Sequence, residues 1–363
     1  MQPYDAILLV SFGGPEGPEE VLPFQRRVTA GRGIPDARLE EVGEHYFRFG
    51  GRSPINDQNR ALLAALRSEL DARGESVPLL WGNRNSAPFI VDTLRDAHAA
   101  GIRRIVAVTT SAYASYSSCR QYRENLADAV TALAGEGRRL QIDKIGPYAV
   151  RPGFREANLG RLVEAMRDVG DVPDAQLALL FVTHSIPDAM DETSGPGDEP
   201  GRRYQQQHLA LAAELTDGVN HALDRGLVGE LVYCSRSGPP TQPWLEPDVN
   251  EAIERLAGQG ASVVVAAPIG FVSDHMEVVY DLDTEARATA EKLGLGFVRA
   301  ATAGVDPQFV AMARDLLLER AAVERGEDVV RAAVGSLEPS WDVCPRGCCA
   351  NARGPRPAIC GED

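Results

Sequence analysis

The feature that most constrains the fold of this 363-residue chain is a regular alternation of short apolar runs with longer amphipathic segments. Most of the runs are rich in Val, Ile and Leu at successive positions and therefore lack a polar face. That pattern is typical of parallel strands covered by helices on both sides. The predicted strands are Ala6–Phe12, Val77–Gly82, Arg104–Thr110, Leu177–His184, Glu230–Cys234, Ser262–Pro268 and Leu295–Arg299.

Predicted helices fill the intervals between these strands, so the fold class is α/β with doubly wound parallel sheets. The same set of elements occurs twice. We predict a first domain over residues 1–150, a second over 151–305, and a C-terminal helix with a Cys-rich extension over 306–363. The predicted helices include Asn59–Ala72, Pro88–Ala100, Tyr116–Ala134, Arg155–Val169, Arg203–Arg225, Asp274–Leu293 and Pro307–Arg325.

The charge balance excludes some partners. With 52 acidic and 37 basic residues the formal net charge is −15, which argues against binding to nucleic acid or to an anionic membrane surface. The first apolar run is too short for a secretion signal, and no stretch is long enough to span a membrane. We therefore expect a cytoplasmic protein with reduced thiols.

Two predicted strands deliver polar groups at their carboxyl ends, where ligands of open α/β sheets bind. One strand ends in His184, followed by Ser185-Ile186-Pro187. The other continues into Asp274-His275-Met276-Glu277 at the start of a helix. A lone histidine at a strand end is more often structural, but two such ends bearing His and Glu suggest a site.

Three carboxylates, Glu277, Asp281 and Glu285, are spaced i, i+4, i+8 and therefore lie along one face of the predicted helix. Like charges at this spacing destabilise a helix slightly, so a purely structural segment gains nothing from them. One interpretation is a solvated acidic face on an acidic protein. The other is a track of oxygen ligands that passes a divalent cation toward a His/Glu site.

The segment Phe271–Glu285 resembles the signature of the ferrochelatases, and Thr183–Pro187 resembles their other active-site strand end. Further similar motifs follow in the family's order and extend the resemblance over roughly residues 5–325. They are Leu8–Pro15, Gly50–Ile55 and Ser235–Pro239 with Trp244.

The resemblance implies two Rossmann-like domains with a porphyrin cleft between them. It also implies a reaction of haem biosynthesis, the insertion of ferrous iron into a porphyrin with release of two protons. By this analogy His184 is the base and a metal contact, and Glu277 is its partner in metal binding or proton relay. Asp281 and Glu285 form the outer relay, and His275 supports the site.

The resemblance also implies residues that contact the porphyrin, and two positions depart from the family's pattern. Phe12 stands where some bacterial relatives have a tyrosine that ligates iron. His45 stands where relatives carry a propionate-binding arginine, with Arg48 and Arg52 close by in sequence. The implied porphyrin contacts are Phe12, Tyr46, Ser53 and Tyr122.

Four of the six cysteines crowd the end of the chain as Cys344-x3-Cys348-Cys349-x10-Cys360. A zinc knuckle, a disulfide staple and an iron–sulfur site all remain open from the residues, although zinc sites usually show a C-x2-C pair. Some ferrochelatases carry a [2Fe–2S] cluster on a similar extension. The resemblance therefore implies such a cluster on the four tail cysteines, with Cys119 as a substitute for one of the adjacent pair.

For the substrate we favour coproporphyrin III over protoporphyrin IX. Only two of the 37 basic residues are lysines, and this bias together with the tail resembles actinobacterial family members that use coproporphyrin. The expected partners are the porphyrin, ferrous iron and, transiently, neighbouring haem-pathway enzymes. The alternatives are a cobalt or nickel tetrapyrrole chelatase and a haem- or porphyrin-binding protein without turnover.

Overall fold

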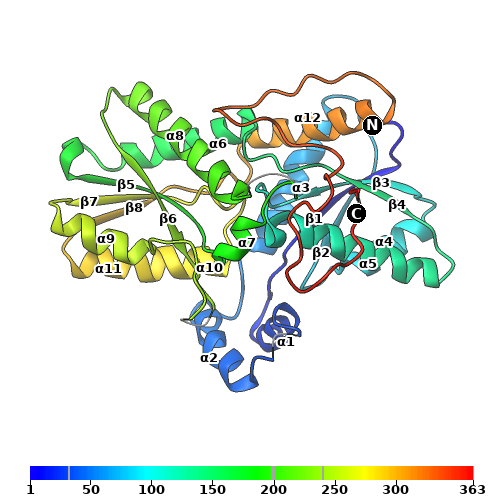
Figure 1. Cartoon of the computed structure of the whole chain (residues 1–363), viewed down its shortest axis with the longest axis horizontal. Coiled ribbons are helices and arrows are strands. Elements are labelled where there is room, and N and C mark those ends of the chain that lie inside the picture. Colours follow the sequence, from blue (N-terminus) through cyan, green and yellow to red (C-terminus); the bar gives the residue numbers. More distant parts are fainter. Residues whose placement is uncertain (32, 198–200, 239–240, 363) are drawn as a thin grey trace.

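Two four-stranded parallel sheets form the centre of the computed structural model, which describes residues 1–31, 33–197, 201–238 and 241–362. They lie side by side, each with helices on its faces (Figure 1). Pro239 of the Ser235–Pro239 motif and Asp363 of the extension lie outside the described residues.

The first sheet has the strand order β2-β1-β3-β4, and every neighbouring pair is parallel. The central strand β1 is buried at all positions, as its continuous apolar sequence predicts. Its strands are β1 Ala6–Ser11, β2 Leu79–Asn83, β3 Arg104–Thr109 and β4 Gln141–Lys144. The helices of this half are α1 Pro18–Val28, α2 Asp36–Phe47, α3 Ile55–Asp71, α4 Ile90–Ala99, the π-helix η1 Tyr116–Arg120 and α5 Gln121–Gly135.

The second sheet repeats this topology with the order β6-β5-β7-β8. Its strands are β5 Leu177–His184, β6 Gly229–Cys234, β7 Val263–Ala267 and β8 Gly296–Arg299. The helices are α6 Pro152–Arg167, η2 Asp174–Gln176, α7 Asp188–Glu192, α8 Arg203–Leu223, α9 Val249–Gly258, α10 Met276–Val278, the π-helix η3 Val279–Ala286 and α11 Arg287–Lys292.

A shared core joins the two halves. Helix α12, Pro307–Glu324, packs on α6 and also on α3, and one hydrophobic cluster contains side chains from both sheets. Beyond α12 the described residues up to Glu362 turn back over the molecule without further helix or strand and end beside the first sheet (Figure 1). We propose the division 1–150, 151–305 and 306–363, with α12 as the helix that holds the halves together.

All seven predicted strands are present, with ends shifted by at most two residues, and the α/β class is confirmed. Strand β4 was not predicted, because its four residues alternate in exposure and include Gln141 and Asp143. Helices α1, α2, α7 and α9 are also outside the predicted set. The single helix expected over Asp274–Leu293 is α10, η3 and α11 in succession. Among the described residues, no helix combines the length and apolar character needed to cross a membrane.

Candidate active site

The predicted pair His184 and Glu277 meets at the carboxyl edge of the second sheet. His184 is the last residue of β5, and Glu277 lies in α10, which the chain reaches after leaving β7. The Nε2 atom of His184 lies 3.5 Å from Oε2 of Glu277, and both side chains remain partly open to solvent. The two strand ends singled out in the sequence therefore form one site.

The imidazole of His184 is held in a defined orientation. Its Nδ1 atom lies against the carbonyl oxygen of Ser185, which can only accept, so Nδ1 carries a hydrogen and Nε2 is the ring atom left to face Glu277. Ser185 is fixed in turn, because its hydroxyl donates to the carbonyl of Leu245 and its N–H to that of Cys234. His184 thus directs a basic nitrogen toward Glu277.

Buried polar side chains of α8 contact the end of β5. The Tyr204 hydroxyl donates to the His184 carbonyl oxygen at 2.9 Å and also contacts Thr183 Oγ1. His208 contacts the same Thr183 oxygen through Nε2, and Tyr113 stacks on its ring at 3.5 Å. Burial lowers the pKa of His208 to about 3, so this histidine is neutral and structural.

The acidic track follows Glu277 into the π-helix η3, which carries Asp281 and Glu285. Such segments are rare and are often found at functional sites. Burial raises the pKa of Asp281 to about 7, with further contributions from the charges of Glu277 and Glu285 and an opposing hydrogen bond from Ser235. Asp281 can therefore take up and release a proton near neutrality.

Two other carboxylates near the track have a different role. Asp274 and Asp283 both pair with Arg299, the last residue of β8, whose guanidinium spans the loop and the helix. The backbone N–H of Asp274 also donates to Gln58 on α3 at 2.7 Å. These contacts fix the loop that precedes Glu277. Within that loop His275 lies edge-on to Phe271, and burial lowers its pKa.

Two of the implied porphyrin contacts, Phe12 and Tyr46, flank Phe24 of α1, each with ring centroids 6.0 Å from it. Burial raises the pKa of Tyr46, and the charges of Glu277 and Asp281 raise it further. Helix α2 therefore places Tyr46 near the His/Glu pair.

Tyr122 lies near Phe12, because the side chain of Arg84 contacts both rings. The sequence alone did not single out Arg84. The Arg84 guanidinium lies over the Tyr122 ring at 4.5 Å and over the Phe12 ring at 5.5 Å from the centroids. Its position directly after β2, beside the end of β1 that leads into Phe12, was the signal that could have identified it.

The remaining residues predicted near the porphyrin pack differently. Ser53 is buried against Gly14, where an added Cβ would lie 2.6 Å from the Ser53 Cβ. His45 stacks on Tyr280 of η3 with ring centroids 3.7 Å apart, and Arg48 lies above the same ring. The exposed Arg52 pairs with Asp57.

Four thiols gather at the junction of the tail with the first sheet. Cys344, Cys348 and Cys349 form a buried cluster with Ala114, against which Trp341 packs, and Sγ of Cys348 lies 3.8 Å from Sγ of Cys349. The pKa of Cys344 is lowered by hydrogen bonds from Cys119, on η1, and from Cys348. The structure thus joins Cys119 to three of the tail cysteines.

The fourth tail cysteine points elsewhere. Cys360 Sγ accepts a hydrogen bond from the backbone N–H of Lys144 at 3.0 Å and contacts the carbonyl of Ile142 on β4. The remaining cysteine, Cys234, is buried at the end of β6. Within the described part of the chain, no group of three or more His, Cys, Asp or Glu side chains has the arrangement of a site for a metal ion.

The family model and the most similar proteins found by comparison indicate the same family. A family model described as Ferrochelatase matches residues 4–321. Proteins named coproporphyrin III ferrochelatase from Streptomyces coelicolor and Leifsonia xyli are 54% and 48% identical to this chain, cover 99% of it, and match over 97% and 94% of their own lengths. A solved structure of SirB from Bacillus subtilis with Fe3+ is similar with a TM-score of 0.48 and 13% identity, covering 88% of this chain and 97% of that one.

Asp281 should make stability depend on pH. Because burial raises the pKa of this carboxyl to about 7, the folded protein loses stability as the pH rises from about 4 through 7 and the buried carboxyl ionises. Asp281→Asn should therefore stabilise the protein at pH 8 in metal-free buffer, and the gain should vanish below about pH 4. Denaturant unfolding across this range measures the difference. Glu291→Gln, at an exposed position on α11, is the control and should show no such trend.

Proposed function

This chain belongs to the ferrochelatase family, and on that premise we propose that it inserts ferrous iron into coproporphyrin III in haem biosynthesis. The observation that carries the proposal is the approach of His184 Nε2 to Glu277 Oε2 beside a carboxyl with a pKa near 7. Metal insertion needs a group that removes two pyrrole protons and a group that receives the cation, and this arrangement offers both.

In the proposed mechanism the free lone pair of His184 Nε2 accepts a proton from a pyrrole N–H as iron enters the ring. Glu277 contacts the cation or takes the proton from the imidazolium that forms. Asp281 passes the proton outward, because its pKa of about 7 lets both protonation states occur at neutral pH. Glu285, farther along η3, completes the path to solvent. Two protons leave for each iron inserted, which balances the exchange.

We propose that arginines near the aromatic contacts bind the carboxylates of the porphyrin. Coproporphyrin III carries four propionates, so its site needs cations that are not already neutralised. Among the described residues, Arg27, Arg48 and Arg84 form no ion pair with a carboxylate, and each has its guanidinium over an aromatic ring. An arginine held in this way is suited to bind a carboxylate through two hydrogen bonds. Phe12, Tyr46, Ser53 and Tyr122 complete the proposed contacts.

We also propose that Cys119, Cys344, Cys348 and Cys349 hold a [2Fe–2S] cluster. The thiols are buried together and are not joined in disulfides, and thiolates are the ligands that such clusters require. When bound, the cluster supplies one-electron redox chemistry, and no step of the insertion needs it. Six free thiols also favour a reducing compartment, so we propose the cytoplasm, where neighbouring pathway enzymes could make transient contact.

Loss of either catalytic group should abolish turnover but not binding. His184→Ala and Glu277→Gln should each reduce the rate of iron insertion by at least about 100-fold, since a positioned acid or base contributes that much. The rate is followed by absorbance with Fe²⁺ and coproporphyrin III, and porphyrin affinity by fluorescence quenching. Full activity in either variant would contradict the role of that residue. Preferred insertion of cobalt or nickel into sirohydrochlorin would contradict the reaction.

Substrate choice should depend on Arg84. We expect Arg84→Met to raise the KM for coproporphyrin III about tenfold with little change in kcat, because a charged hydrogen bond contributes at least that much to binding. Steady-state insertion assays measure both constants, and wild type should prefer coproporphyrin III to protoporphyrin IX. The exposed Arg73→Met is the control of equal charge change. An unchanged KM would remove Arg84 from the binding site.

The cysteine assignment predicts different results for Cys119, on η1, and for Cys360, in the tail. Cys119→Ser should remove the visible absorption of the anaerobically purified protein, because it deletes a proposed ligand. Cys360→Ser should retain the absorption, because the Cys360 thiol contacts the backbone of β4 instead. Absorption spectra with iron and sulfide analysis provide the readout. The opposite result would return the fourth ligand to Cys360.

A further inference from the structure

Two buried cations at the cysteine site have no carboxylate partner within the part of the chain that the structure describes. The side chain of Arg123, on α5, is among the most buried in the protein at 1% exposure, and that of Lys144, at the end of β4, is 3% exposed. Within the described residues, neither forms an ion pair with a carboxylate, whereas most other buried arginines do. An uncompensated charge in the protein interior is strongly unfavourable.

The hydrogen bonds of Arg123 leave most of its guanidinium unused. Its Nε donates to the carbonyl of Ile359 at 2.6 Å, and both Nη atoms are buried without a hydrogen-bond partner. The tail packs directly against this group, since a Cβ added to Gly361 would collide with an Nη atom. The free donors therefore lie in a closed space between α5 and the tail.

The two cations lie against the thiols or the tail segment that carries them. Lys144 Nζ donates to Cys119 Sγ at 3.6 Å. An Nη atom of Arg123 lies against Gly361, and Gly361 pairs with Cys344 in an isolated parallel bridge. Both cations are thus in contact with segments that carry the proposed cluster ligands.

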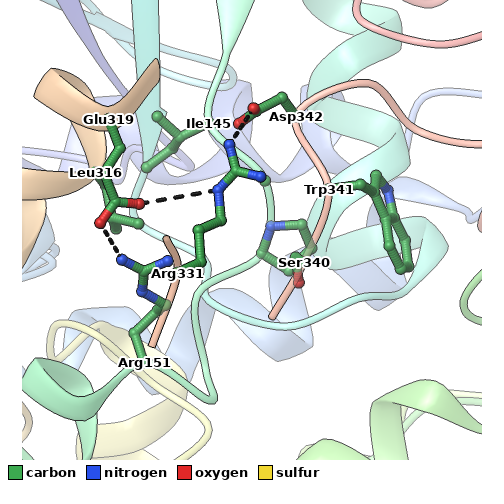
Figure 2. A pocket seen from close by; sticks show the side chains of 10 residues that line it. Ile145, Arg151, Leu316, Glu319, Arg331, Ser340, Trp341 and Asp342 are labelled. Carbon is green, nitrogen blue, oxygen red and sulfur yellow. Dashed lines mark hydrogen bonds and ion pairs between the residues drawn. The ribbon is translucent and has the colours of Figure 1, made fainter. Parts of the chain in front are cut away.

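The tail is held firmly enough to enclose such a site. Arg331 of the tail pairs with Glu319 on α12 and with Asp342, and Glu319 also pairs with Arg151 (Figure 2). These groups line a cavity of about 20 Å³ beside Trp341, the residue that covers the thiols. The ion pairs fix the tail segment that leads into Cys344.

We propose that Arg123 and Lys144 are the built-in counter-charge of the four-cysteine centre and set its reduction potential. This rests on the cluster proposed above. An oxidised [2Fe–2S] centre with four thiolates carries two negative charges, which two cations balance, and one-electron reduction adds a third. Because the cations favour the more negative state, they raise the reduction potential, and the buried setting makes the effect large.

The test is a redox titration of the full-length protein, purified without oxygen and monitored by absorbance and electron paramagnetic resonance. Arg123→Met and Lys144→Met should each shift the reduction equilibrium at least about tenfold toward the oxidised cluster, which corresponds to 59 mV for one electron. Arg123→Lys keeps the charge and should remain near wild type. Arg353→Met, an exposed tail position, is the control and should show no shift. Wild-type potentials in both Met variants would overturn the proposal while leaving the cluster intact.

Other outcomes are also decisive. If the Met variants cannot retain a cluster, cluster content is the readout: recovery in Arg123→Lys supports the proposal, and equal loss there overturns it. A colourless wild type containing zinc would refute the cluster. The counter-charge would then be judged by the release of zinc to a chelator, which should be faster in the Met variants than in Arg353→Met. A wild type without any bound metal overturns both proposals.

Discussion

The parallel pairing of strands around β5 is the constraint on which the active site depends. Parallel strands end at the same edge of a sheet, so β5, β6 and β7 deliver their following residues to one place. His184 arrives as the last residue of β5, and the loop after β7 leads to Glu277. A register shift of one residue would turn His184 to the opposite face of the sheet. The buried contacts of Tyr204 and His208 with the end of β5 resist such a shift.

The first half of the chain contributes to this site through α2. Tyr46 lies near Glu277 and Asp281, and His45 stacks on Tyr280 of η3. The π-helix η3 therefore carries Asp281 and Glu285 of the acidic track, and it also contacts α2 of the first half. This arrangement places the proposed porphyrin contacts of the first half beside the proposed proton path of the second.

The cysteine site joins distant segments in a similar way. The first half supplies Cys119, Arg123 and Lys144, and the tail supplies three thiols. In the complete chain both cations are buried. Thiolate charge, rather than carboxylate charge, is then available to compensate them. Carboxylates elsewhere in the chain pair with arginines on the surface.

The sequence by itself determined the α/β class, all seven apolar strands and the pair His184 and Glu277, because these follow from local periodicity and strand-end position. Only the tertiary structure decided that Arg84 lies between Phe12 and Tyr122, that Cys119 and not Cys360 joins the other thiols, and that η3 is a π-helix. Those facts depend on which distant segments pack together. Side-chain contacts across more than 200 residues, such as Lys144 with Cys360, leave no periodic trace in a single sequence.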